Sequence, residues 1–108
     1  MNIAVFANTS WYIYNFRLNT MKALRDQGYN VIAIGPADPY VEKIKAEGFQ
    51  HIEITMKGSS VNPLFELKTL FNLYQCFRKN QIKLTLSFTP KANIYASLLA
   101  APLRMYTL

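Results

Sequence analysis

The stretch that decides the fold is Asn2–Arg17, which reads Asn-Ile-Ala-Val-Phe-Ala-Asn-Thr-Ser-Trp-Tyr-Ile-Tyr-Asn-Phe-Arg. Its apolar run, Ile3–Ala7, predicts a strand that is buried on both faces. The run stops at Asn8-Thr9-Ser10, residue types that favour turns and helix N-caps, and a helix is predicted to follow. In an open parallel sheet, this junction directs backbone N–H groups and the positive end of a helix dipole toward the carboxyl edge, where ligands bind.

The rest of the chain repeats this alternation of strand and helix. Glycines 28 and 48 are predicted to end two helices, because glycine adopts the left-handed conformation without a Cβ clash, and Asn80 is predicted to act likewise at a third. Three such helix-to-strand returns predict βαβ repeats and a parallel sheet. The expected strands are residues 30–34, 50–54, 84–88 and 103–108, and the expected helices run from about 13 to 27, from Asp38, from Asn62, and from about Asn93 to a stop at Pro102.

The predicted fold is therefore α/β, with a three-layer, Rossmann-like open parallel sheet and helices on both faces. We expect the strand order 3-2-1-4-5, which makes the first and fourth strands neighbours at the switch point. The 108 residues suffice for a single domain, residues 1–108, and leave no room for a second. A buried parallel strand rarely closes a domain, so the final strand suggests a fragment of a longer protein.

Composition narrows the class of protein. The longest apolar stretch, Ile94–Leu103, is far shorter than the roughly 20 residues needed to span a bilayer. The sequence opens on a strand and has no basic segment followed by an apolar signal region, so a cytoplasmic location is expected. Cys76 occupies an apolar position of a predicted helix and is interpreted as part of the core.

The net charge of +6 is unevenly distributed. Residues 1–56 contain five basic and five acidic residues, whereas residues 57–108 contain seven basic residues and one acidic residue. Such an excess suits a phosphate-bearing ligand, an anionic membrane surface or nucleic acid. Arg78 and Lys79 fall in the last turn of a predicted helix, where the dipole favours cations even without a partner, so the alternatives stay open.

Several motifs are missing from the sequence. No G-x-G-x-x-G follows the first strand, and no P-loop sequence or receiver-type phosphorylation site is found. His51 lies on a predicted edge strand with no Ser, Cys or carboxylate at a triad-like placement, so it is interpreted as an ordinary edge residue. No catalytic set is complete.

Polar residues gather where the first and fourth predicted strands end. They form the rim of a predicted cleft: Asn8, Thr9, Ser10 and Trp11 on one side, Thr89, Pro90, Lys91 and Asn93 on the other. Helix capping alone also explains Asn8, Thr9, Ser10 and Asn93. Lys91 is more informative, because a cation at a helix start opposes the dipole and calls for an anion such as phosphate.

Aromatic residues follow the first strand as well. Trp11 and Tyr12 are expected to be exposed, where they suit stacking on a sugar or a place at the lipid headgroup layer. Tyr14 and Phe16 are predicted to be core. The later helix carries an apolar stripe that is predicted to pack on the sheet, formed by Leu67, Leu70, Phe71, Tyr74 and Phe77.

Four segments of the chain resemble the N-terminal half of family 4 glycosyltransferases of the two-domain GT-B architecture: Asn2–Arg17, Gly35–Tyr40, Asn62–Leu64 and Ser87–Tyr95. The resemblance is strongest to the bacterial branch that builds capsule, lipopolysaccharide and other surface polysaccharides on a lipid-linked acceptor. It implies that this chain supplies the acceptor side of the cleft. A C-terminal domain, with a pair of Glu residues at E-x-x-x-x-x-x-x-E spacing, would supply the nucleotide-sugar site, and no such pair is present here.

The resemblance also implies roles for residues of this chain. Asn8–Trp11 would lie near the acceptor or the donor diphosphate, Lys91 near phosphate, and Asn15 and Arg17 would support the first loop. With Thr89, Pro90 and Asn93 these form the predicted substrate-binding set, and no catalytic or metal-binding residue is assigned. The implied partners are the donor-binding domain, a lipid-linked glycan and the inner membrane surface. No nucleic acid partner and no cofactor beyond the nucleotide-diphosphate sugar are expected.

The leading hypothesis is the acceptor-binding half of a retaining glycosyltransferase, inactive alone because groups from both domains must stabilise the diphosphate charge. A second hypothesis is a flavodoxin-like module whose Asn8-Thr9-Ser10 loop holds a flavin or nucleotide phosphate. A third is a non-catalytic subunit that pairs with a separate donor-binding chain.

Overall fold

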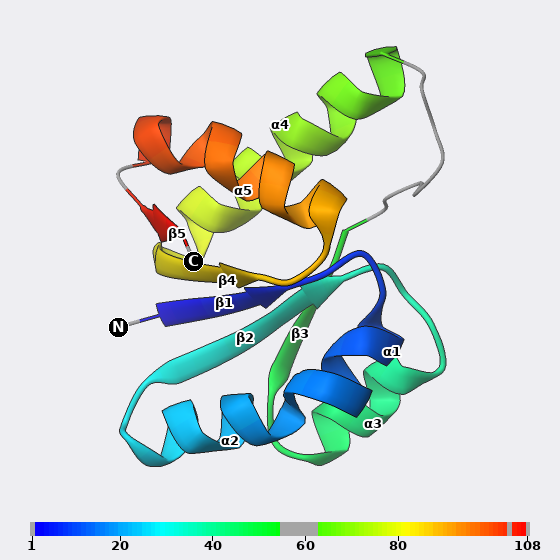
Figure 1. Cartoon of the computed structure of the whole chain (residues 1–108), viewed down its shortest axis with the longest axis vertical. Coiled ribbons are helices and arrows are strands. Elements are labelled where there is room, and N and C mark those ends of the chain that lie inside the picture. Colours follow the sequence, from blue (N-terminus) through cyan, green and yellow to red (C-terminus); the bar gives the residue numbers. More distant parts are fainter. Residues whose placement is uncertain (1, 55–62, 104, 108) are drawn as a thin grey trace.

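A parallel sheet forms the centre of the computed structural model, which describes residues 2–54, 63–103 and 105–107 (Figure 1). The five strands are arranged in the order β3-β2-β1-β4-β5. Every neighbouring pair is parallel, and the short β5 continues the sheet beyond β4. The predicted α/β class and strand order are confirmed. The strands are β1 (Asn2–Phe6), β2 (Asn30–Gly35), β3 (Gln50–Glu53), β4 (Ile82–Ser87) and β5 (Tyr106–Thr107).

Helices cover both faces of this sheet. Figure 1 shows α1, α2 and α3 on one face and α4 and α5 on the other. The first helix is continuous but changes type along its length, because a π-helical segment, η1, separates α1 from α2. The helical elements are α1 (Ser10–Tyr12), η1 (Ile13–Arg17), α2 (Leu18–Asp26), α3 (Tyr40–Ala46), α4 (Pro63–Lys79) and α5 (Pro90–Leu103).

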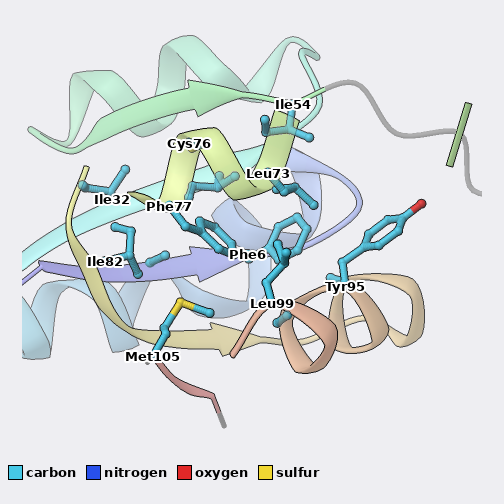
Figure 2. Close-up of a cluster of buried hydrophobic side chains, with 14 residues drawn as sticks. Phe6, Ile32, Ile54, Leu73, Cys76, Phe77, Ile82, Tyr95, Leu99 and Met105 are labelled. Atoms are coloured by element: carbon cyan, nitrogen blue, oxygen red, sulfur yellow. The ribbon is translucent and has the colours of Figure 1, made fainter. Parts of the chain in front are cut away.

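Successive side chains of a strand point to opposite faces of the sheet, so the strands contribute residues to two separate hydrophobic clusters, one on each face. Phe6 and Ile34 point toward α4 and α5, where the Phe6 ring lies edge-on to Phe77 with centroids 6.0 Å apart. On the opposite face, Val5 and Ala33 pack on the first helix and α3. Figure 2 shows the first cluster with side chains from β1, β2, α4 and α5 converging.

Cys76 lies inside the first cluster, as predicted (Figure 2). Burial raises the pKa of its thiol to about 11. Tyr95 adds its ring to the same cluster, while its hydroxyl points away from the other labelled side chains.

Two helix boundaries differ from the prediction. The first helix begins at Ser10 rather than near Ile13, because Thr9 is the N-cap and its Oγ1 accepts from the Tyr12 N–H at 3.1 Å. The last helix begins at Pro90 rather than Asn93, with its first turn closed by the Asn93 N–H on the Thr89 carbonyl at 2.8 Å. Pro102 lies inside that helix instead of stopping it after two turns.

The predicted left-handed positions are confirmed at Gly28 and Gly48, whose φ angles are 96° and 92°. The left-handed position predicted at Asn80 is wrong by one residue, since the positive φ, 54°, falls on Gln81. Asn80 instead completes the end of α4, where its backbone N–H and its side-chain amide both donate to the Cys76 carbonyl.

Three apolar side chains predicted to be core are exposed. Leu67 and Phe71 are 63% and 60% exposed, and Phe16 is 56% exposed. The predicted stripe is confirmed at Phe77, which is buried, and Leu73 and Cys76 complete the buried face of α4. Leu67 and Phe71 lie on the side of α4 that is turned away from its buried face, so both side chains meet solvent.

The predicted polar loop at residues 56–61 and the Asn62 cap lie outside the described residues. Over the part of the chain that is described, no helix combines the length and the apolar character needed to cross a membrane.

Candidate functional site

The loops after β1 and β4 meet at the carboxyl edge of the sheet. The Asn8 backbone N–H donates to Thr89 Oγ1 at 3.1 Å, a contact between residues 81 positions apart. Just below it, the Phe88 N–H donates to the Phe6 carbonyl at 3.2 Å. Thr89 is buried and Asn8 is partly buried, and this contact fixes the two loops against each other. The two predicted sides of the rim therefore form one surface.

A second set of contacts ties the residues after β1 to the loop after β2 and to β3. Ser10 is fully buried, and its Oγ donates to the Pro36 carbonyl at 2.7 Å and lies 2.8 Å from His51 Nε2. Gly35 permits this approach, because a Cβ there would stand 3.1 Å from the Ala7 carbonyl oxygen and 3.5 Å from Ser10 Oγ.

Asp38 adds two further contacts to this junction. Its Oδ2 accepts from the Trp11 N–H at 2.9 Å, and its Oδ1 accepts from the Tyr40 N–H at 2.8 Å. One carboxylate thus accepts from N–H groups in the first turns of both the first helix and α3. The sequence prediction that Asp38 caps the short helix is confirmed, and its contact with Trp11 was missed.

The interpretation of His51 as lacking a serine partner is wrong, since Ser10 lies within hydrogen-bond distance. The direction of that bond argues against catalysis. The only Ser10 proton goes to Pro36, so Ser10 Oγ must accept from an Nε2–H, and the imidazole is a donor here rather than a base. Burial, and next Lys45, lower the pKa of His51, against the opposing effect of Asp38 and Glu53, and favour the neutral ring.

Asn15 and Arg17, the two residues assigned to support the first loop, both contact residues of the first helix. Asn15 Nδ2 donates to the Trp11 carbonyl at 2.9 Å. Arg17 Nη2 donates to the Tyr12 hydroxyl at 3.0 Å, and the guanidinium carbon lies 4.3 Å from the centroid of the Phe88 ring. Arg17 therefore connects the first helix to the end of β4, a contact that sequence reasoning missed.

The remaining predicted residues lie at the start of α5. Asn93 is exposed, and only its backbone contact with Thr89 is described. Pro90 and Lys91 form the first turn of α5, and their side chains lie outside the described part of the structure. In the residues that are described, no three His, Cys, Asp or Glu side chains come together as metal ligands.

Two pockets lie outside the predicted set of residues. A pocket of about 270 Å³ adjoins His51 and Asp38 beside α3, at the carboxyl edge. A pocket of about 350 Å³ is found at the opposite edge, near Gln81 and Lys83 at the start of β4. Ligands of open parallel sheets bind at the carboxyl edge, so the larger pocket is the less informative one.

Comparison with known proteins identifies the chain's relatives. The family model of the glycosyl transferase 4-like family matches residues 2–108. Over 100 residues the chain is 30% identical to the N,N'-diacetylbacillosaminyl-diphospho-undecaprenol alpha-1,3-N-acetylgalactosaminyltransferase of Campylobacter jejuni. That match covers 93% of this chain and 27% of the relative.

Solved structures show the same fold. MurG of Acinetobacter baumannii superposes with a TM-score of 0.78 at 16% identity, over 98% of this chain and 33% of that protein. A glycosyltransferase of Rickettsia africae superposes with a TM-score of 0.74 at 19% identity, over 98% of this chain and 28% of that protein. The chain thus spans about a quarter to a third of the length of these proteins. Because the family model matches nearly every residue, the chain belongs to the glycosyl transferase 4-like family.

Proposed function

We propose that this chain forms the acceptor side of a glycosyltransferase that moves a sugar from a nucleotide-diphosphate sugar to a lipid-linked glycan. The observation that carries the proposal is the junction at Asn8 and Thr89, which joins the polar loops of two central strands at the carboxyl edge. In a sheet of this type, that edge is where ligands bind. Membership of the family supplies the class of reaction.

The donor sugar is held by a second domain in this proposal. The chain matches 27% of the Campylobacter relative, which leaves most of that protein for other parts of the reaction. Stabilising the charge that develops on the departing diphosphate requires donors from both walls of a closed cleft. These 108 residues alone are therefore expected to bind acceptor without transferring sugar to it.

The acceptor in the proposal is a saccharide on a prenyl diphosphate. The name of the Campylobacter relative places a diphospho-undecaprenol group on its own substrate, and this chain is 30% identical to it. The amino end of α5, with Lys91 in its first turn, suits an acceptor phosphate because the helix dipole and the lysine charge both attract anions. Synthesis of surface polysaccharides such as capsule or lipopolysaccharide uses acceptors of this class.

A lipid-linked acceptor implies contact with the membrane, and we assign this to α4 and α5. Four large apolar side chains on these helices are 57–63% exposed: Leu67, Phe71, Ile94 and Leu98. Exposed Lys68 adds positive charge beside them. The chain should sediment with vesicles that contain phosphatidylglycerol and should not sediment with neutral vesicles. The Phe71→Gln substitution should reduce the fraction of the chain that sediments with the anionic vesicles. Equal binding of the variant would contradict this assignment.

Ligand discrimination tests the proposed function. A short-chain prenyl diphosphate bearing N-acetylhexosamine should raise the melting temperature of the chain, whereas flavin mononucleotide should not. Stabilisation by the flavin alone would favour a flavodoxin-like module instead. A transfer assay completes the test, since turnover by these 108 residues without a donor-binding domain would contradict the two-domain arrangement.

A further inference from the structure

An aromatic cluster lies on the first helix beside the site, and it is partly open to solvent. The Trp11 and Phe16 rings meet edge to face at 5.5 Å, and Tyr12 lies 5.2 Å from Phe16. Trp11 is 45% exposed and Phe16 is 56% exposed. Two large rings kept adjacent and open to solvent suit stacking on the apolar face of a sugar ring.

Arg17 places a positive charge next to these rings. Its guanidinium carbon lies 4.3 Å from the Phe88 centroid and 5.6 Å from the Tyr12 centroid, so aromatic faces fix its orientation. Its Nε is buried and has no hydrogen-bond partner among the described residues. The ion pairs formed within the described part of the chain are Lys22–Glu47 and Lys45–Glu42, and neither includes Arg17. An oriented guanidinium with spare donors is suited to phosphate.

The π-helical segment brings Arg17 and Tyr12 together. Residues five positions apart are separated by roughly 140° around an ordinary α-helix. The wider turn of η1 reduces that separation, and the Arg17 Nη2 to Tyr12 hydroxyl bond of 3.0 Å results. Because the hydroxyl oxygen accepts this bond, its own proton is available to a ligand. Single π-helical turns inside α-helices are frequent at functional sites.

We propose that Arg17, together with the Trp11 and Phe16 rings, forms a subsite for a glycosyl phosphate. The guanidinium and the Tyr12 hydroxyl bind phosphate oxygens, and the exposed rings stack on the adjoining sugar. The inference rests on the proposed function and narrows it to the part of the substrate in which sugar and phosphate are joined. Both an acceptor and a nucleotide-diphosphate sugar carry that linkage.

Trp11 is the only tryptophan of the chain, so its fluorescence reports directly on the subsite. Titration with N-acetylglucosamine 1-phosphate should give a saturable change, and free N-acetylglucosamine or inorganic phosphate should bind more weakly. Arg17→Gln should weaken binding of the sugar phosphate by about tenfold or more, because a charged hydrogen-bond donor is lost. Phe16→Ala, at an exposed position, should weaken it by about threefold. Arg17→Lys keeps the charge and should retain part of the affinity.

Matched variants elsewhere provide the controls. Arg25 also stacks on an aromatic ring, at 4.6 Å from the Phe49 centroid, and Tyr29 is another exposed aromatic residue. Arg25→Gln and Tyr29→Ala should leave the dissociation constant unchanged. Far-UV circular dichroism checks that each variant is folded.

The outcomes separate this inference from the proposed function. If the prenyl diphosphate sugar still raises the melting temperature while Arg17→Gln and Phe16→Ala bind the sugar phosphate like the unmodified chain, the subsite is wrong and the proposed function stands. If neither the sugar phosphate nor the prenyl diphosphate sugar binds, both are wrong. Tighter binding of the prenyl diphosphate sugar than of uridine diphosphate N-acetylglucosamine identifies the acceptor as the source of the phosphate, and the reverse order identifies the donor.

Discussion

Replacing Ser10 by Ala should destabilise the chain by removing the contacts that join the start of the first helix to the loop after β2 and to β3. Ser10 is fully buried and makes two hydrogen bonds, to Pro36 at 2.7 Å and from His51 at 2.8 Å. The hydroxyl deletion leaves a carbonyl oxygen and an imidazole N–H without their partner. Pro36 and His51 are each only partly buried, so water restores part of the loss, and we expect about 2 kcal/mol in total.

For a chain of 108 residues, that loss corresponds to a fall in melting temperature of roughly 9 °C. Urea denaturation followed by circular dichroism gives the free energy of unfolding, and calorimetry gives the melting temperature. Ser97→Ala is the matched control, because Ser97 is exposed on α5 and its loss should change stability by less than about 0.5 kcal/mol. Equal stability of the Ser10→Ala and Ser97→Ala variants would refute the role given to the Ser10 hydroxyl.

The remaining predictions concern pH and backbone conformation. Burial lowers the pKa of His51 in the folded chain below 6.5, so as the pH falls the unfolded chain takes up a proton at this residue before the folded chain does. The stability that the neutral His51 gives the folded chain is therefore complete above pH 6.5 and is lost as the pH falls. The difference in urea midpoint between the unmodified chain and His51→Gln should therefore shrink from neutral to acidic pH, and a constant difference would be inconsistent with it. Gln81→Gly should raise the free energy of unfolding by about 0.5–1 kcal/mol, because glycine adopts the φ of 54° found at this position without strain. An unchanged or lower urea midpoint would show that the backbone at Gln81 is not strained. Gly28→Ala should lower the free energy of unfolding by about 1 kcal/mol through backbone strain alone, since an added Cβ would meet nothing within 4 Å. An unchanged free energy of unfolding would contradict this prediction.

The sheet was predictable because local signals agree along the chain. The apolar run of β1 and the glycines at 28 and 48 define strands and helix ends without reference to distant residues. Once the βαβ repeat is recognised, the handedness rule leaves few strand orders. The neighbouring positions of Asn8 and Thr89 follow from that order alone.

Helix faces were harder to predict, because periodicity identifies an apolar face but not the surface that covers it. Leu67 and Phe71 continue the stripe of α4 with the right spacing, yet they are exposed because the buried face of the helix is centred on Leu73. Phe16 was also predicted to be core, and it is exposed. Its exposure follows from the π-helical segment, which changes the rotation of side chains around the helix and has no simple sequence signal.

Contacts between loops were the part of the site that sequence could not provide. Ser10 and His51 are 41 residues apart, and their bond reaches across the end of β2, which lies between β1 and the edge strand β3. Arg17 was recognised as a supporting residue, but its stacking on Phe88 depends on β4 lying next to β1. Such contacts follow from the assembled sheet rather than from any local pattern.

The central claim is that the loops after β1 and β4 form the acceptor surface, and NMR chemical-shift mapping tests it most directly. A water-soluble prenyl diphosphate sugar added to the ¹⁵N-labelled chain should shift the amide signals of Asn8–Trp11 and Thr89–Asn93, apart from Pro90, which has no N–H. Signals at the opposite edge, at Gln81 and Lys83, should stay in place. Shifts confined to that opposite edge, with none at Asn8 or Thr89, would contradict the account.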